Sequence, residues 1–500
     1  MTRLASASAS TSGRHRQEDG VHACAGSNTT EIDRSRFTKA LRLLAVRVPC
    51  SRAAEVRKEL KRLRLLLNVP RVKPIVPAPS NPDHERLVLM RREDLDGDGD
   101  IEGLLGSIDA NGQHGGELTG GHGDHPELQT LVQNGPFALE WYTHQLDYSY
   151  WTASQVLRHV LPCSVEEVPS AFETVGHIAH LNLRDDLLPY KRLIGQVILD
   201  KNAPRIRTVV NKMGKIENTF RVLPMEVIAG EDDMEAKVIQ HRIHFAFNFA
   251  EVYWNSRLEQ EHARLVSTFQ PGQTILDLTA GVGPFAIPAA KKGCTVHAND
   301  LNPRCVAYLA KNAKANGVSK IQTYCMDAKD FVRKFVAANP PALAAAEAAI
   351  AGDPSSAPPS SRPVPFDHAV MNLPASGVEL LTAFKGFLPS SGDGVAASEL
   401  AMPLVHCYTF GTTATGGHKV DGEVLDSGAD SNRDSKKASD AAATRAMMAE
   451  VVREAEQVLG CPLDPAKHQV TTREVRDVAP NKRMVLLSFR VPVEVAAGIQ

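Results

Sequence analysis

The segment from residue 275 to residue 302 constrains the fold more than any other part of this 500-residue chain. It reads ILDLTAGVGPFAIPAAKKGCTVHANDLN: an apolar run ending at Asp277, a glycine-rich turn, a helix of small residues, a second apolar run, and Asp300. A parallel strand that enters a tight turn and then a helix leaves backbone N–H groups pointing at whatever lies above the strand end. Gly281 and Gly283 let a ligand approach that backbone closely. The segment therefore predicts the front half of a nucleotide-type site in an α/β sheet.

The spacing between the turn and Asp300 indicates what the ligand carries. Asp300 lies 19 residues beyond Gly281, where a carboxylate at the tip of the next strand can accept both ribose hydroxyls of an adenosine. Pro284 removes an N–H that a pyrophosphate would use, which argues against NAD and FAD. A tight strand-to-helix connection without a ligand is the alternative at this point.

Polar residues also end the next two apolar runs. Asp327 follows IQTYCM, where it could accept from the amine of adenine, and Asn372 ends FDHAVMN. With Asp277 and Asp300 they predict four polar strand ends at one edge of a sheet. Open α/β sheets bind ligands at that edge, so a site without a ligand is disfavoured.

Composition sets the broad class of the chain. Its length and 43% hydrophobic content predict a globular protein of about two to four domains. The eight cysteines form no C-x-x-C pair and no zinc-type cluster, so we expect reduced thiols and no bound metal. The stretch ALAAAEAAIAG is too short to cross a bilayer, so we expect no membrane segment.

Changes in pattern divide the chain into a tail and three domains. Residues 1–31 begin with an arginine-bearing, Ser/Ala-rich stretch without acids, which predicts either a mitochondrial transit peptide or a disordered tail. Residues 32–165 start with a strand-like ALRLLAVRVP and a helical SRAAEVRKELKRLRLLL, residues 166–250 alternate strands with short helices, and residues 251–500 form the cofactor domain. We expect biased segments to form loops or insertions at 94–125, 337–364 and 411–442.

The insertion at 94–125 begins D-x-D-x-D-G, like the first half of a calcium loop. Its twelfth position holds Leu105 where a bidentate glutamate is required, which disfavours calcium.

Positive charge is concentrated before the cofactor domain, although the formal net charge of the chain is only −2. Residues 34–73 hold 13 Lys and Arg against two acids, and residues 190–215 hold seven against one. Such patches attract phosphate backbones. A solvated helix face is the alternative for either patch alone.

Several of these motifs together resemble one known family. They are DLTAGVGPF, NDLNP, MNLP, VYWNSRLEQEHARL and VRDVAPNKRMVLLSF, with LNLRDDLLPYKRLIGQVILDKNAPRIRTVVNK and FTKALRLLAVRVP upstream. The chain resembles the eukaryotic and archaeal tRNA (guanine-N1)-methyltransferases that act on position 37. The resemblance implies a C-terminal Rossmann-like class I methyltransferase domain, preceded by two smaller α/β (α+β) RNA-binding domains.

The resemblance also implies the ligands. The cofactor is expected to be S-adenosylmethionine, and the product N1-methylguanosine, which maintains the reading frame and can be the first step toward wybutosine. The partner is expected to be tRNA, held at its anticodon loop and elbow, with the enzyme a monomer in the mitochondrial matrix, nucleus and cytoplasm. The residues implied to bind the cofactor, together with the two turn glycines, are Tyr253, His262, Gly281, Gly283, Asp300, Leu301, Asp327, Ala328 and Asn372.

Three residues are implied to carry the chemistry. N1 of guanine holds a proton at neutral pH, and Glu261 is the candidate base that removes it. Its alternative is a surface ion pair with Arg257 on the same helix face. Arg221 would stabilise the charge that builds on guanine O6, and Asn372 could hold the guanine edge.

Two other functions compete with this prediction. The sister enzyme of wybutosine synthesis transfers the aminocarboxypropyl arm of the same cofactor, and has no obvious use for a base and a guanine clamp. A catalytically silent RNA-binding protein would keep the basic patches and lose the cofactor contacts.

Overall fold

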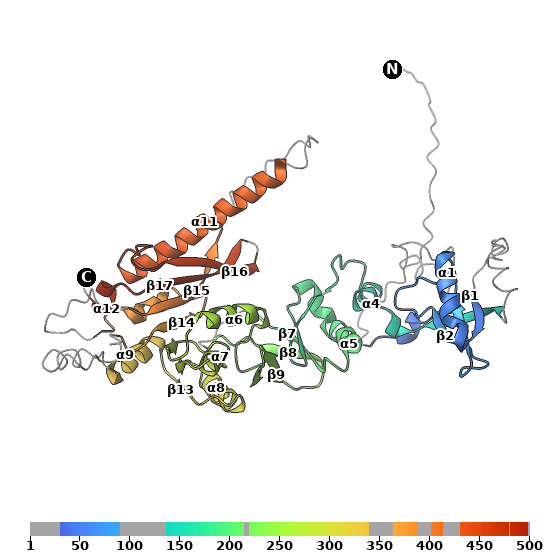
Figure 1. Cartoon of the computed structure of the whole chain (residues 1–500), viewed down its shortest axis with the longest axis horizontal. Helices are drawn as coiled ribbons and strands as arrows, with labels where there is room; N and C mark the ends of the chain where they lie inside the picture. The colour runs from blue at the N-terminus through green and yellow to red at the C-terminus, as the bar shows by residue number, and fades with distance from the viewer. Residues whose placement is uncertain are drawn as a thin grey trace, which may run out of the picture. The chain divides into compact units, whose positions relative to one another are not determined.

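The structure is a computed structural model that describes residues 31–90, 137–169, 171–214, 220–339, 364–388, 402–413, 431–479 and 481–498. Contacts divide the chain into two compact units, each drawn in Figure 1. The first comprises Met1–Ser170 with Arg184–Asn202, and the second Ala171–Leu183 with Ala203–Gln500. Because residues 184–202 group with the first unit, the proposed division into three domains stays a prediction. The predicted tail and the insertion at 94–125 lie outside the described residues.

An antiparallel sheet in the order β2-β3-β1-β4 builds the first unit. Its longest strand, β1, is the predicted ALRLLAVRVP segment. Val46 and Val48 pack on one face of the sheet with the helix α1, whereas Leu43 and Ala45 enter a second cluster, as the alternation of a strand requires. The bounds are β1 (Lys39–Pro49), β2 (Ile75–Pro77), β3 (Glu85–Leu89), β4 (Ala138–Leu146) and α1 (Ala53–Arg62).

The predicted helix after β1 is shorter than its pattern suggests. It ends at Arg62, and Arg64 has a left-handed φ of 60°, which turns the chain out of the helix. Leu67 therefore packs against the sheet from a loop. Two further helices, α4 (Ala153–Val160) and α5 (Lys191–Asn202), complete this unit and contact each other.

The second unit begins with a small mixed sheet, β5-β6-β7-β8, and a separate hairpin, β9-β10. In the small sheet β6 and β7 run parallel, and the outer strands are antiparallel to them. The hairpin turns at His241 and Arg242, both with positive φ, as a tight two-residue turn requires. The bounds are β5 (Glu173–Val175), β6 (Ile178–Leu181), β7 (Thr208–Lys212), β8 (Met225–Gly230), β9 (Glu235–Gln240) and β10 (Ile243–Asn248).

A seven-stranded sheet in the order β13-β12-β11-β14-β15-β17-β16 forms the centre of the second unit. The first five strands are parallel, and β17 is antiparallel to both of its neighbours. The bounds are β11 (Thr274–Asp277), β12 (Thr295–Asn299), β13 (Ile321–Tyr324), β14 (His368–Asn372), β15 (Leu404–Thr412), β16 (Thr471–Ala479) and β17 (Lys482–Arg490).

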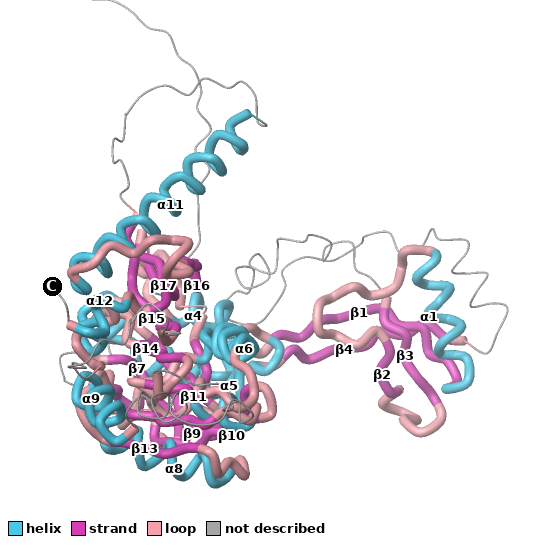
Figure 2. The backbone as a smooth tube through the Cα atoms, turned by 60° about the vertical axis from the view of Figure 1, so that its left-hand side comes forward, coloured by secondary structure: helices cyan, strands magenta, loops and turns pink. Residues whose placement is uncertain are grey.

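Helices cover both faces of this sheet, as Figure 2 shows. Within β11, Ile275 points into one hydrophobic cluster and Leu276 into the other, which is why the parallel strands are apolar throughout. One cluster takes residues from α6 (Glu259–Thr268), α7 (Ala286–Lys291) and α8 (Pro303–Ala315). The opposite cluster takes residues from α9 (Ala328–Ala338), α11 (Ser431–Leu459) and α12 (Val493–Ala497).

The expectation that residues 411–442 form one surface loop is wrong at both ends. Strand β15 runs to Thr412, and α11 begins at Ser431 and extends beyond the sheet (Figures 1 and 2). The sequence from 431 to 459 is rich in Ala and contains no Gly, which favours helix, so the Gly-rich stretch ends before the helix begins. Of the expected insertion at 337–364, residues 337 and 338 belong to α9, and 340–363 lie outside the described residues.

A pair of buried histidines lies near the N-terminal ends of β14 and β15. His368 and His406 approach within 3.1 Å, and Ser488 Oγ lies 2.9 Å from His406 Nδ1. Burial lowers the pKa of His368 to about 4 and that of His406 to about 3. The folded protein therefore holds both rings neutral, whereas the unfolded chain protonates them near the ordinary pKa of about 6.5.

This pair should make the fold sensitive to acid. The stability that the neutral rings provide is present above pH 6.5 and lost as the pH falls toward 4, because the unfolded state then binds more protons. Replacing both, in His368→Asn with His406→Gln, should reduce the slope of unfolding free energy against pH by up to about 2.7 kcal/mol per pH unit. Urea unfolding followed by circular dichroism between pH 4.5 and 6.5 tests this, and parallel curves for the two proteins would contradict it.

Candidate active site

Four neighbouring parallel strands bring their polar ends to one edge of the sheet, as the sequence predicts. Their order, β13-β12-β11-β14, places in succession the ends that carry Asp327, Asp300, Asp277 and Asn372. Asp327 caps α9 by accepting from the Lys329 N–H at 2.8 Å. The expected crevice is therefore present at the carboxyl ends of the strands.

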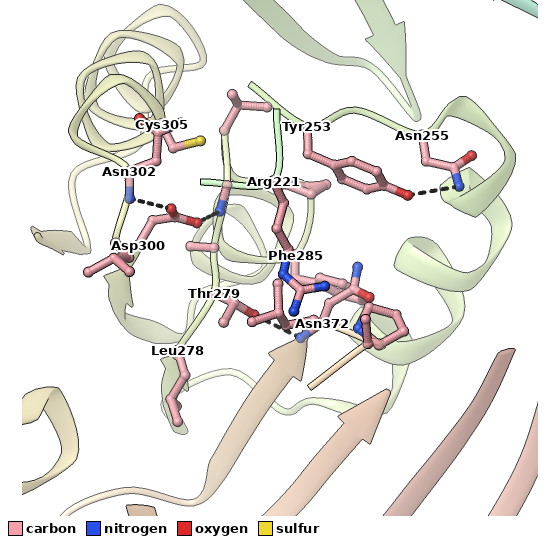
Figure 3. A pocket seen from close by; sticks show the side chains of 18 of the residues that line it. Arg221, Tyr253, Asn255, Leu278, Thr279, Phe285, Asp300, Asn302, Cys305 and Asn372 are labelled. Carbon is pink, nitrogen blue, oxygen red and sulfur yellow. Dashed lines mark hydrogen bonds between the residues drawn. The ribbon is translucent and has the colours of Figure 1, made fainter. Parts of the chain in front are cut away.

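A cavity of about 360 Å³ opens at this edge, within the size range of small-molecule sites. Figure 3 shows side chains around it. Most of the predicted site residues line it: Arg221, Tyr253, His262, Gly281, Asp300, Leu301, Asp327, Ala328 and Asn372. Glu261 and Gly283 are not among the residues of its wall.

The two glycines of the turn have different roles in the structure. A side chain at Gly281, with φ 55°, would meet no atom within 4 Å, so this position faces open space in the cavity. A Cβ at Gly283 would lie 2.6 Å from Leu309 Cδ1 and 2.7 Å from Ile287 Cδ1. Gly283 therefore permits close packing of the helices behind the turn, and its contact with a ligand stays a prediction.

Asp300 holds the glycine turn and faces the cavity at the same time. Its carboxylate accepts from the Gly281 N–H at 2.8 Å and from the Asn302 N–H at 2.9 Å (Figure 3). Burial raises the pKa of this carboxyl, and the two backbone donors oppose that effect. The remaining lone pairs can accept from a ligand that enters between the turn and the strand tip.

Asp277, the first polar strand end, does not share this exposure. It is fully buried, and neither carboxyl oxygen makes a hydrogen bond to a described residue. Burial, and secondly the charge of Asp300, raise the pKa of Asp277 to about 8, which keeps the carboxyl protonated at neutral pH. The residue belongs to the support of the turn rather than to the cavity wall.

Asn372 offers a buried acceptor to the cavity. Its N–H donates to Thr279 Oγ1 at 2.8 Å, which ties β14 to the glycine turn. Its side-chain Oδ1 is buried and has no hydrogen-bond partner in the described part of the chain. A buried carbonyl without a donor is costly, so this atom indicates that a ligand supplies one.

Arg221 reaches the cavity from the segment between β7 and β8. It takes a left-handed φ of 56°, and its Nη2 donates to Ser376 Oγ at 2.6 Å. Figure 3 shows the guanidinium directed to the part of the cavity where Asn372 lies. The sequence gives no sign of this unusual backbone conformation.

Tyr253 lies before the helix that the sequence places ahead of the glycine turn, and His262 lies within that helix. That helix starts later than expected, with a short turn at Ser256–Leu258 and α6 from Glu259, so Tyr253 lies in the preceding loop and is half exposed. Burial lowers the pKa of His262 to about 3, and its neutral ring packs edge-on against Phe285.

Glu261 lies behind the cavity wall in a closed cluster. Its carboxylate accepts from Arg264 Nε at 2.8 Å, from Arg264 Nη2 at 2.7 Å and from Tyr408 OH at 2.9 Å. The ion pair with Arg257 that served as the alternative is absent from the described contacts, because Arg257 pairs with Glu173. The Tyr408 ring of this cluster packs on Phe285, which does line the cavity.

Sequence reasoning missed the apolar wall. Its members adjoin the predicted polar residues along the chain, and that adjacency is the signal that could have found them. They include Leu278, Phe285, Cys305 and Met326. Among the described residues no group of three or more His, Cys, Asp or Glu could hold a metal ion, and no helix in these ranges is long and apolar enough to span a bilayer.

The sheet, the glycine turn and the Asp300 carboxylate define a Rossmann-like class I methyltransferase domain. A family model described as the TRM5/TYW2 methyltransferase domain matches residues 238–340, and one described as the TYW2 N-terminal domain matches residues 153–233. The chain is 38% identical over 472 residues to a tRNA (guanine(37)-N(1))-methyltransferase of Phytophthora infestans, covering 93% of each. It is 34% identical over 468 residues to that of Homo sapiens, covering 93% of this chain and 77% of the relative. The chain belongs to the family of tRNA (guanine(37)-N(1))-methyltransferases.

Solved structures share the fold. Wild-type Trm5b from Pyrococcus abyssi superimposes with a TM-score of 0.50 at 20% identity, covering 89% of this chain and 98% of that one. The complex of aTrm5 and tRNALeu gives a TM-score of 0.50 at 17% identity, covering 90% and 100%.

Proposed function

We propose that this protein transfers the methyl group of S-adenosylmethionine to N1 of guanosine 37 in tRNA. The observation that carries the proposal is one cavity that unites the glycine turn and Asp300 with Arg221 and the unsatisfied Asn372 Oδ1. The glycine turn and Asp300 suit an adenosine, whereas Arg221 and Asn372 suit the polar edge of a base. Membership of the family supports the same reaction.

The residues present fit the cofactor. Gly281 leaves open space at the turn, Asp300 keeps free lone pairs for ribose hydroxyls, and Asp327 and Ala328 lie at the neighbouring strand end where an adenine would reach. When bound there, S-adenosylmethionine supplies an electrophilic methyl group. The side chains of the protein orient the guanine that accepts the methyl group and remove its N1 proton.

On the acceptor side, Arg221 is placed to stabilise negative charge on guanine O6 as N1 loses its proton. Asn372 Oδ1 can accept from an N–H of the guanine edge. We propose Glu261 as the base, which requires that Arg264 release the carboxylate when RNA is bound. The target base must leave its stack to enter the cavity.

Replacing Asp300 should weaken cofactor binding. In Asp300→Ala the ribose acceptor and the bond to the Gly281 N–H are both lost, so we expect the Kd for S-adenosylmethionine to rise about tenfold or more. Calorimetry measures the Kd directly. Thr152→Ala removes a helix cap outside the cavity wall and serves as a comparison; an unchanged Kd in Asp300→Ala would place the ribose elsewhere.

The reaction is tested with purified protein, cofactor and a tRNA transcript carrying guanosine 37. Mass spectrometry of nucleosides should show N1-methylguanosine, and the adenosine 37 transcript should give no product. Transfer of the aminocarboxypropyl arm would give a heavier nucleoside and favour the wybutosine enzyme TYW2, which both matching family models also name. Tight RNA binding with no cofactor binding would favour a silent RNA-binding protein.

The remaining expectations stay proposals. The basic segment 34–73 would hold the tRNA elbow, and the enzyme would act as a monomer. Location in the mitochondrial matrix, nucleus and cytoplasm can be tested by following a fluorescent fusion with and without residues 1–31. Mitochondrial signal that survives this deletion would exclude the tail as the targeting segment.

A further inference from the structure

A second, smaller cavity adjoins the first and has no assigned role. Its volume is about 130 Å³. Four residues line both cavities: Tyr253, Trp254, Asn255 and Arg476. A group bound in the second cavity would therefore lie directly beside whatever occupies the first.

Lys212 is a half-buried cation of this second cavity. It ends β7, and burial lowers the pKa of its ammonium, which is the cost of holding a charge partly out of water. No hydrogen bond joins this ammonium to another residue of the described ranges. The negative charge of Glu173 acts on Lys212 and favours its charged form. That carboxylate, however, already forms an ion pair with Arg257, and His180 lies 3.5 Å from it.

Arg476 stands where the two cavities meet. A β-bulge interrupts the pairing of β16 with β17 between Glu474 and Arg476, and such bulges redirect a side chain. The guanidinium donates from Nη1 to Asn255 Oδ1 at 3.3 Å and from Nε to the Asp477 carbonyl at 3.1 Å. Its other N–H groups stay available for a ligand.

We propose that the second cavity binds a backbone phosphate of the RNA beside the extruded guanosine, with Lys212 and Arg476 as its cations. This inference rests on the proposed function, because a flipped nucleotide in the first cavity carries a phosphate on each side. A phosphate supplies a negatively charged hydrogen-bond acceptor for the Lys212 ammonium, whereas a neutral base or sugar does not. Anchoring that phosphate would fix the position of the guanine relative to Arg221.

A phosphate-neutralisation cycle tests the proposal. Full-length tRNA is assembled by ligation with a single methylphosphonate at the phosphate 5′ or 3′ of guanosine 37, and Kd and single-turnover rate are measured. Neutralising one of these phosphates should weaken binding to the wild-type enzyme by about tenfold or more. Lys212→Met should weaken binding of unmodified tRNA similarly, and reduce the salt slope of log Kd by about one. In Lys212→Met the methylphosphonate should then cause a smaller loss than in the wild type, because only Arg476 still contacts the phosphate.

Matched controls separate the possible outcomes. Lys311→Met, at an exposed position of α8, should bind tRNA as the wild type does. Lys212→Arg should restore most of the affinity, and Arg476→Gln gives the same cycle if Lys212→Met fails to fold. No loss at either phosphate, or losses that add in the variant, would overturn the phosphate site while leaving methylation by the wild type intact. A wild type that forms no N1-methylguanosine would overturn the proposed function instead.

Discussion

Arg221→Ala is expected to slow methyl transfer by about 100- to 1,000-fold, the usual cost of removing a donor aimed at developing negative charge. The negative charge on guanine O6 grows only as N1 loses its proton, so the guanidinium stabilises the transition state more than the bound substrate. Its bond to Ser376 Oγ and its left-handed backbone hold it in place before the substrate arrives. Binding of S-adenosylmethionine should not change, because the adenosine side of the cavity is untouched.

Single-turnover rates at saturating tRNA and cofactor measure this effect. Arg221→Lys keeps the charge without the planar fork and should recover only part of the rate. Ser376→Ala removes the anchor and leaves the guanidinium, so its loss should be smaller than that of Arg221→Ala. An Arg221→Ala enzyme with a raised KM for tRNA and an unchanged kcat would assign Arg221 to binding alone.

The edge of the sheet was predictable from the sequence because its signals are local. Apolar runs identify the strands, and the rule that parallel strands end together places Asp300, Asp327 and Asn372 at one edge without further information. The same rule does not predict which of the side chains at these strand ends face the cavity and which are buried. Asp277 occupies an equivalent position, yet the turn that follows it closes over the side chain and leaves it protonated.

Contacts that join distant segments were not predictable. Helical spacing predicted Arg257, four residues before Glu261, as the partner of this carboxylate. In the structure its partners are Arg264, three residues after it, and Tyr408, which lies 147 residues away on β15. The alignment of β14 with β15 sets Tyr408 opposite Asn372, and a single sequence does not give that register. The second cavity depends in the same way on a bulge in β16 and on Lys212 at the end of β7.

Glu261→Gln is expected to lower the single-turnover rate by about 100- to 10,000-fold, the range for a positioned general base. The amide keeps the size of the side chain and can still accept from Tyr408, so the helix should remain folded. In the structure, however, three donors already occupy the carboxylate. Removal of the N1 proton therefore requires that Arg264 turn away, and Arg264 is only partly buried, with 30% of its side chain exposed.

The variant Arg264→Gln separates a base from a structural anchor. If Glu261 is the base, Arg264→Gln removes the group that covers it and should retain at least about ten times the rate of Glu261→Gln. If Glu261 serves only to hold Arg264, the two variants break the same ion pair, so their rates and thermal midpoints should fall together and the double variant should lose no more. Wild-type turnover in Glu261→Gln would require another proton acceptor. Within the described cavity wall the carboxylates, Asp300 and Asp327, lie at the adenosine end, so the acceptor would then be the neutral His262 ring, water or the RNA itself.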